Sequence, residues 1–360
     1  MKKFILLAFF SVTTTCVFSQ TADEYVVLGK NKSVAHDYSG AIADYSTAIK
    51  LDPNNILAYF NRGLCKLDLK DYSSQIEDCT ATIELDPKHA AAYYCRGLCK
   101  YYLKDSYGAI EDYTATNKLD PKYTLAYNYR GVCKENLKDY YSAIKNFDEV
   151  IKIDPKYDGG FTNRGSCKEH FKDYYGAIKD YDEAIKLDPT FAGTYVNRGI
   201  CRYDLKDYYG AIENCNQAIK VDSNCAPAYN IRSVCKRELK DYYGAIEDCT
   251  EAIKLDPNNP GAYNNRGLCK EHLKDYNGAI EDYNDAIKFD PNLAIAFNNR
   301  GNCKAKLTDY PGAITDYNKA IVINPEDSAS YYSRGSCKEA LKDHLGASQD
   351  YKIATKMKVK

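Results

Sequence analysis

The sequence predicts an all-α fold, a solenoid of ten 34-residue helix–turn–helix repeats over residues 22–360. Two observations predict it. Proline recurs every 34 residues, with one gap of 68, at Pro53, Pro87, Pro121, Pro155, Pro189, Pro257, Pro291 and Pro325. Glycine keeps the same spacing, with Ser233 as the exception, at Gly29, Gly63, Gly97, Gly131, Gly165, Gly199, Gly267, Gly301 and Gly335. Periods of this length are typical of chains in which similar units stack on one another.

The first segment, residues 1–20, is predicted to be a secretory signal peptide. Two lysines precede an apolar run over residues 4–12, and small residues stand at the −3 and −1 positions of a cleavage before Gln20. The run is well short of the roughly 20 residues that a membrane span needs. We therefore expect an exported protein, periplasmic or secreted, whose mature chain has no integral membrane span. Lipid anchoring at Cys16 is an alternative that this pattern leaves open.

Each following unit carries two apolar-periodic stretches joined by a short turn. Residues 262–273 and 276–289 are an example, and Lys274-Asp275 joins them. Apolar spacings of three and four place these side chains on one face of a helix. Asp290-Pro291 ends the second helix, because proline disfavours helical geometry in the residue before it. One such hairpin cannot bury its apolar face alone, so neighbouring units must stack.

The pattern resembles the tetratricopeptide repeat family, whose unit has aromatic residues at positions 4, 17 and 24, a small residue at 8, alanine at 20 and 27, and proline at 32. With Ala22 as position 1, position 4 is aromatic in all ten units, and Gln75 alone departs from alanine at position 20. The resemblance implies a right-handed superhelical solenoid. Its repeats are residues 22–55, 56–89, 90–123, 124–157, 158–191, 192–225, 226–259, 260–293, 294–327 and 328–360. The last unit, with Ser348 at position 21 and a charged end, is expected to be a cap.

Arginine fills position 7 in nine repeats, and position 23 is aspartate in eight and asparagine in two. Matched columns of opposite charge suggest ion pairs. The first repeat has Asp44 but Leu28 in place of arginine, as expected if each arginine reaches back to the preceding repeat. We therefore predict pairs such as Asp44–Arg62 and Asp282–Arg300, and we interpret them as part of the scaffold.

Cysteine fills position 10 in nine repeats, and we interpret it as a small buried hydrophobe. Neighbouring first helices pack about 8–10 Å apart, beyond the ~7 Å Cα separation that a disulfide allows. The column is therefore not expected to bridge itself. An exported protein nevertheless folds in an oxidising compartment. Three repeats have a second cysteine in place of the aromatic residue at position 24, so the candidate disulfides are Cys65–Cys79, Cys201–Cys215 and Cys235–Cys249.

No catalytic, cofactor or metal site is recognisable in the sequence. His89, Cys95 and Cys99 supply at most three ligands, and a closed zinc site needs four. There is no Ser/His/Asp set and no glycine-rich phosphate loop. The 50 acidic and 49 basic residues nearly cancel, which argues against a general nucleic-acid surface. We therefore expect neither an enzyme nor a nucleic-acid partner.

The family resemblance implies that first helices line a concave groove, where positions such as 5 and 6 contact ligands. Asparagine recurs at these two positions, at Asn61, Asn128, Asn163, Asn197, Asn230, Asn264, Asn265, Asn298 and Asn299. The row looks like the asparagine ladder of the O-linked N-acetylglucosamine transferase superhelix. Asparagine both donates and accepts hydrogen bonds, so such a row can hold an extended peptide backbone. The alternative is that asparagine merely solvates this face.

The Lys/Asn carboxylate clamp of chaperone cofactors is not matched, because lysine and arginine lie at positions 11 and 7 instead. We therefore predict a non-enzymatic scaffold that acts in an exported assembly and binds a protein or an extended peptide in the concave groove. The alternative is a purely structural component of an envelope or secreted complex.

Overall fold

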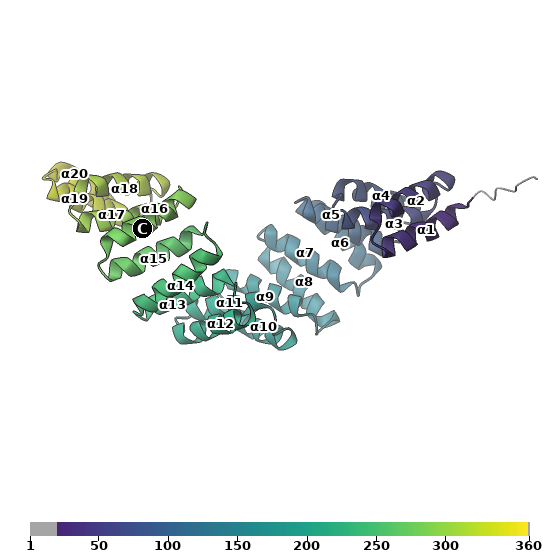
Figure 1. The fold of residues 1–360 in the computed structure, drawn as a ribbon, viewed down its shortest axis with the longest axis horizontal. Coiled ribbons are helices and arrows are strands. Elements are labelled where there is room, and N and C mark those ends of the chain that lie inside the picture. Colours follow the sequence, from purple (N-terminus) through teal and green to yellow (C-terminus); the bar gives the residue numbers. More distant parts are fainter. Residues whose placement is uncertain (1–19, 359–360) are drawn as a thin grey trace, which may run out of the picture. The chain divides into compact units, whose positions relative to one another are not determined.

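The computed structural model describes residues 20–358, so the predicted signal peptide and Cys16 lie outside the described residues apart from Gln20. The chain divides into two units, residues 1–153 and 154–360. The first unit contains α1 (Ala22–Val34), α2 (Tyr38–Leu51), α3 (Ile56–Asp68), α4 (Tyr72–Leu85), α5 (Ala90–Tyr102), α6 (Ser106–Leu119), α7 (Thr124–Asn136) and α8 (Tyr140–Ile153). Each odd-numbered helix packs on the even-numbered helix that follows it (Figure 1).

The second unit continues the same alternation of helices. It contains α9 (Asp158–His170), α10 (Tyr174–Leu187), α11 (Ala192–Asp204), α12 (Tyr208–Val221), α13 (Ala226–Glu238), α14 (Tyr242–Leu255), α15 (Pro260–His272), α16 (Tyr276–Phe289), α17 (Ala294–Lys306), α18 (Tyr310–Ile323), α19 (Ser328–Ala340) and α20 (His344–Lys358). The described part of the chain has no strand. The predicted all-α fold of paired, stacked helices is therefore confirmed, with one pair in each 34-residue repeat.

The predicted turn between the two helices of a repeat is built from a left-handed residue followed by a capping aspartate. Lys274 has a φ of 64°, and its N–H donates to the carbonyl of Glu271 at 2.9 Å. The N–H of Asp275 donates to the Lys270 carbonyl at 2.9 Å, so the last carbonyls of α15 are satisfied. The Asp275 carboxylate then accepts from the Gly278 N–H at 3.0 Å and caps α16.

The second helix ends where the sequence predicts. Asp290 leaves the helical region, with φ −132° and ψ 94°, immediately before Pro291. Its N–H still donates to the carbonyl of Ala286 at 2.9 Å, so the helix is closed before the chain extends.

The two helices of a repeat approach closely at position 8. An ideal Cβ added to Gly267 would lie 2.7 Å from Cε1 of Tyr283, which is fully buried on the facing helix. In the repeat where serine replaces this glycine, Cys249 replaces the facing aromatic residue and leaves room for the Ser233 side chain. Cysteine at position 24 of this repeat therefore compensates for serine at position 8.

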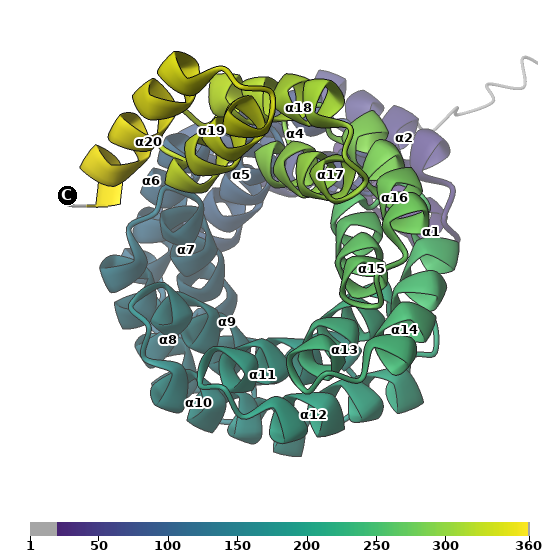
Figure 2. The ribbon, with the colours of Figure 1, turned by 90° about the vertical axis from the view of Figure 1, so that its left-hand side faces the viewer.

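Stacking of the pairs places the first helices on the inner side of each unit. Successive first helices contact one another, such as α13 with α15 and α15 with α17, whereas no two successive second helices do so in the described part of the chain. Figure 2 shows the same arrangement within the second unit, where α11, α13, α15 and α17 lie inside α12, α14, α16 and α18. The inner face of each unit is therefore made by first helices.

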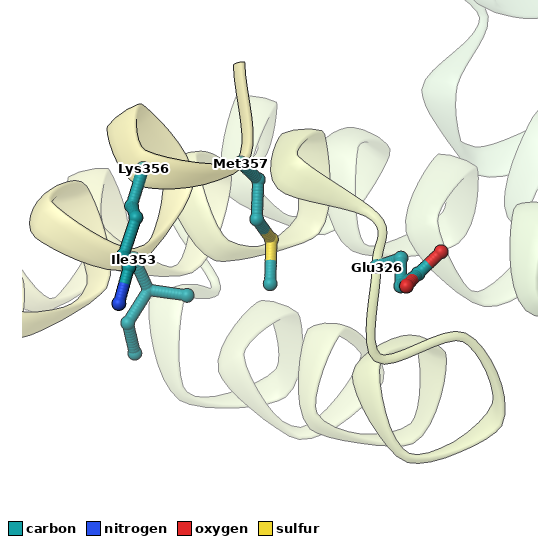
Figure 3. Close-up of a pocket in the computed structure, with 4 residues that line it drawn as sticks. All are labelled: Glu326, Ile353, Lys356 and Met357. Carbon is teal, nitrogen blue, oxygen red and sulfur yellow. The ribbon is translucent and has the colours of Figure 1, made fainter. Parts of the chain in front are cut away.

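The last repeat, which the sequence predicts to be a cap, combines apolar and charged side chains at its end. Ile353 and Met357 of α20 line a cavity of about 480 Å³ together with Lys356 and with Glu326 from the loop between α18 and α19 (Figure 3). Ser348, which replaces the usual isoleucine, is exposed. The end of the described chain thus combines an apolar depression with charged residues at its edge.

Candidate functional site

The first helices of the second unit carry a row of asparagine side chains that bond to one another across repeat boundaries. Nδ2 of Asn265 donates to Oδ1 of Asn230 at 3.0 Å. One repeat further, Nδ2 of Asn299 donates to Oδ1 of Asn264 at 3.1 Å. Position 5 of one repeat is therefore linked to position 6 of the next. The row acts as a connection between repeats as well as a polar surface.

Burial differs along this row. Asn128, Asn264 and Asn299 are buried, with 6–8% of their surface exposed. The other six predicted site residues are partly buried: Asn61, Asn163, Asn197, Asn230, Asn265 and Asn298. The side chains of Asn61 and Asn197 make no hydrogen bond within residues 20–358. An asparagine amide has two donors and an acceptor oxygen, so one bond to a neighbour leaves further groups for a ligand.

A cavity of about 440 Å³ lies at the end of the row, among α15, α17, α18 and α19. Asn302 joins the cavity to the row, because its Nδ2 donates to Oδ1 of Asn298 at 3.2 Å while its Oδ1 accepts from the Tyr317 hydroxyl at 2.8 Å. Tyr332, which is 56% exposed, and Lys306 also line the cavity. An aromatic ring, a cation and amide groups are therefore available together at one place on the inner face.

The first unit carries an aromatic cluster beside the inner face of α5 and α7, a feature that the sequence reasoning missed. Tyr129, from position 6, lies within 5.7–6.2 Å of the rings of Tyr94, Tyr101 and Tyr113. Tyr94 and Tyr101 occupy positions 5 and 12, which face the same side of the first helices. A search for tyrosine as well as asparagine at positions 5, 6 and 12 of the repeat would have predicted the cluster.

In most repeats the arginine at position 7 pairs with the aspartate of its own repeat, so the predicted pairs Asp44–Arg62 and Asp282–Arg300 are wrong. Nη2 of Arg62 lies 2.6 Å from Asp78, 16 residues later in the same repeat. Asp44 instead pairs with Lys32 at 2.7 Å, which explains why the first repeat keeps the aspartate without an arginine.

Most of these arginines nevertheless reach back to the preceding repeat through another atom. Nη1 of Arg62 donates to the Ser46 hydroxyl at 3.0 Å, and Nη1 of Arg266 donates to the Thr250 hydroxyl at 3.3 Å. These acceptors occupy position 25 rather than position 23. The guanidinium of Arg266 also lies 5.7 Å from the centroid of Tyr263. The column therefore joins the two helices of a repeat and also joins each repeat to its predecessor.

The cysteine column is buried, as the sequence predicts, with every position-10 thiol at most 3% exposed. The three candidate disulfides are not formed, since all six cysteines of Cys65–Cys79, Cys201–Cys215 and Cys235–Cys249 are free thiols. Burial raises the pKa of the Cys95 and Cys249 thiols to about 11. These thiols are therefore protonated at neutral pH, which makes them poor nucleophiles.

Residues 20–358 contain no group of three or more His, Cys, Asp or Glu side chains that could hold a metal ion. Within the same range, no helix has both the length and the hydropathy that crossing a membrane requires.

Several solved structures are similar to this chain. A tetratricopeptide repeat protein from Parabacteroides merdae ATCC 43184 has a TM-score of 0.55 at 16% identity, covering 70% of this chain and 99% of that one. YrrB, described as a TPR protein with an unusual peptide-binding site, has a TM-score of 0.43 at 20% identity, covering 52% and 97%. MamA has a TM-score of 0.44 at 25% identity, covering 45% and 95%. No curated protein matches the chain.

Family models match most of the repeats. A model described as TPR repeat matches residues 37–68. Two models described as tetratricopeptide repeat match residues 56–89, 125–157, 160–191, 192–225, 226–259, 260–293 and 294–327. The matches to the tetratricopeptide repeat models follow the predicted 34-residue frame to within two residues, and all the matches together cover well over half of the sequence. The chain therefore belongs to the tetratricopeptide repeat family.

Proposed function

We propose that this chain is a non-enzymatic scaffold of an exported assembly, and that it binds a protein or an extended peptide along the inner face of its first helices. The observation that carries the proposal is the amide row of the second unit and the cavity at its end. A peptide backbone offers an N–H and a carbonyl at each residue, and amide side chains spaced along a face can bond to both. Tyr332 and Lys306 would then select among side chains.

Binding fits the described residues better than catalysis does. The abundant thiols are buried, and desolvation raises their pKa, as it does to about 12 for Cys99 and Cys269. Nucleophilic catalysis by cysteine needs the opposite, an accessible thiol with a lowered pKa. The most regular charged groups, the Arg–Asp pairs, are already occupied with one another.

Photo-crosslinking in the native host tests where the partner binds. A photoreactive phenylalanine analogue replaces Tyr332 on the inner face of α19, and in a matched variant it replaces Tyr243, which is 73% exposed on α14. We expect adducts with a partner protein from position 332 and none from position 243, identified by mass spectrometry. Adducts only from position 243 would contradict binding at the inner face.

A structural role through the outer helices is the second candidate, and one observation favours it. Tyrosine at position 18 is 73–76% exposed in three successive repeats of the second unit, at Tyr175, Tyr209 and Tyr243. Large exposed apolar patches mark interaction surfaces, and this column of exposed rings is a candidate for one. The same crosslinking pair separates the two roles, since this candidate places the adducts at position 243.

Export is tested separately by cell fractionation and by the N-terminal sequence of the protein purified from its host. A mature chain that begins at Gln20 and lies outside the cytoplasm is the expected result. A cytoplasmic chain that retains residues 1–19 would contradict it.

A further inference from the structure

In most repeats one carboxylate is shared by two cations. In residues 260–293, Asp282 accepts from Nη2 of Arg266 at 2.7 Å and from Nζ of Lys270 at 2.8 Å. Nζ of Lys270 also donates to the backbone carbonyl of Gly278 at 3.3 Å. The two positive charges at positions 7 and 11 thus depend on the single carboxylate at position 23.

The repeat of residues 124–157 has no carboxylate at this place, because Asn146 replaces the aspartate. Oδ1 of Asn146 accepts from Nε of Arg130 at 2.6 Å, and its Nδ2 donates to the Ser142 carbonyl at 2.6 Å. That carbonyl corresponds to the one that lysine holds in other repeats. Lys134 therefore loses both the carboxylate and the carbonyl, and its Nζ makes no hydrogen bond or ion pair within residues 20–358.

Arg130 is also left incompletely satisfied. Nη1 donates to the Thr114 hydroxyl at 3.3 Å, whereas Nη2, which reaches the carboxylate in other repeats, has no acceptor in the described part of the chain. Desolvation by burial lowers the pKa of Arg130. Burial also lowers the pKa of Arg266, but the hydrogen bonds that Arg266 donates to Asp282 and the charge of Asp282 outweigh it, so that the pKa of Arg266 is raised. A partly buried guanidinium without a counter-ion is unfavourable and favours uptake of an anion.

A cavity of about 390 Å³ opens beside these groups, between α7 and α8. It is lined by the cations of Arg130, Lys134 and Lys145 and by Ser142. Position 22, where Lys145 stands, is glutamate in many other repeats, so this substitution adds further positive charge.

Two carboxylates, Asp148 and Glu149, also line the cavity and offset part of its positive charge. Glu149 is held by Lys152 at 3.0 Å, and Asp148 is engaged in an interaction of its own. Asp139 lies near enough for Lys134 to help lower its pKa, although hydrogen bonds from Ser142 contribute more. None of the three takes the place of the missing aspartate, because none pairs with Arg130 or Lys134.

The other repeat with asparagine at position 23 compensates its arginine differently. Nη1 of Arg198 pairs with Asp182 of the preceding repeat at 2.5 Å, and Nη1 of Arg202 keeps the Gly210 carbonyl at 3.4 Å. Arg198 thus has a carboxylate partner that Arg130 lacks, since the corresponding acceptor of Arg130 is the neutral Thr114 hydroxyl. Asparagine in place of aspartate at position 23 is therefore not enough by itself to leave the cations at positions 7 and 11 without partners.

We propose that the cavity beside Asn146 binds an oxyanion of the carboxylate or phosphate type, which bridges Nη2 of Arg130 and Nζ of Lys134. The anion takes the place that an aspartate side chain occupies in neighbouring repeats. It is either a free ion or the acidic side chain of a bound peptide, because both present the same two oxygens.

Thermal unfolding of the full chain tests the site, with inorganic phosphate replacing chloride at constant ionic strength and at low millimolar concentration. A ligand that binds only the folded state raises Tm with concentration, whereas the general effect of phosphate on burial acts on every variant alike. We expect a phosphate-dependent rise in the wild type and its loss in Asn146→Asp, whose new carboxylate fills the site. The matched variant Asn214→Asp is expected to keep the wild-type response.

A glutamate hexamer and a glutamine hexamer, titrated in parallel, distinguish the two sources of the oxyanion. A rise in Tm with the glutamate peptide alone assigns the site to acidic side chains, and a rise with phosphate alone assigns it to a free ion. Lys134→Met is expected to lose either response, and the ³¹P line of phosphate should broaden with the wild type but not with Asn146→Asp. Equal responses of the wild type and Asn146→Asp, or no response of the wild type to any probe, would overturn the proposal.

Discussion

Replacing Gly267 with alanine tests how tightly the two helices of a repeat are packed. The new Cβ would lie 2.7 Å from Cε1 of Tyr283 and 3.0 Å from its Cδ1 and Cζ. Tyr283 is fully buried and lies one turn from the equally buried Ala279, so the ring has little space to withdraw. Overpacking of this kind costs about 1–3 kcal/mol. Alanine recovers about 0.5–1 kcal/mol of that through its better helix propensity. We expect a net loss of stability.

Gly199→Ala is the matched control, because Cys215 replaces the facing tyrosine in that repeat. Its Cβ would lie 3.4 Å from Cβ of Asn214 and 3.7 Å from Sγ of Cys215, which is close to ordinary packing. The helix-propensity gain is then not opposed, and we expect a stabilisation of about 0.4–1 kcal/mol.

Urea unfolding and native-state hydrogen exchange measure the difference. Exchange is the sharper assay, because repeat arrays unfold in parts and the exchange of α15–α16 can be compared with that of α11–α12. The double variant Gly267→Ala/Tyr283→Cys should recover much of the loss, although removal of the ring has its own cost. The reasoning is refuted if Gly267→Ala is as stable as Gly199→Ala.

Four further changes have defined outcomes in urea unfolding. Tyr113→Phe should stabilise the protein by about 1 kcal/mol, because the buried hydroxyl has no partner among the described residues, and a decrease would contradict this. Tyr283→Phe should instead cost about 1 kcal/mol, since its hydroxyl donates to Glu271 at 3.1 Å, and an unchanged midpoint would contradict this. Lys274→Gly should raise stability by about 1 kcal/mol by relieving a positive φ of 64°. Burial raises the pKa of Glu169 in the folded state. Protonated Glu169 therefore contributes most to the free energy of unfolding below its unfolded-state pKa, and this contribution is lost as pH rises through its folded-state pKa. Glu169→Gln should flatten this part of the dependence of stability on pH.

Much of the fold could be predicted from the sequence because each helix end is encoded locally. The left-handed Lys274, the capping Asp275 and the Asp290-Pro291 pair all act within a few residues of themselves. The same helix-end residues then recur every 34 residues along the chain. Local chemistry and repetition therefore suffice for the number, length and pairing of the helices.

The partners of the arginine column could not be predicted in the same way. When two columns recur with one period, pairing within a repeat and pairing with the preceding repeat give the same sequence pattern. The first repeat misled the choice, because Asp44 without an arginine suggested a partner in the next repeat. In the structure Lys32, at position 11, pairs with Asp44 instead. The sequence contains that lysine column, and weighing it would have left both registers open.

The asparagine row was likewise predicted as a surface and found to be partly an interface. Whether a side chain at position 5 or 6 points to solvent or to the next repeat depends on how neighbouring first helices cross, and no local sequence feature specifies that. The bond between Asn299 and Asn264 buries both residues, whereas Asn230 and Asn265 bond to each other and remain partly exposed. The same residue type in the same column therefore differs in what it offers to a ligand.

The arginine column links the repeats through polar bonds that lie between the first and second helices and not on the inner face. A guanidinium has donors in three directions, so Arg266 can hold Asp282 with Nε and Nη2 while Nη1 reaches Thr250 in the preceding repeat. Lysine, with a single nitrogen, cannot span the two partners in a fixed geometry. Joining helices within a repeat and joining repeats to one another are thus one interaction, made between the first and second helices. Position 6 on the inner face takes no part in this interaction, and it holds tyrosine at Tyr129 and asparagine at Asn265.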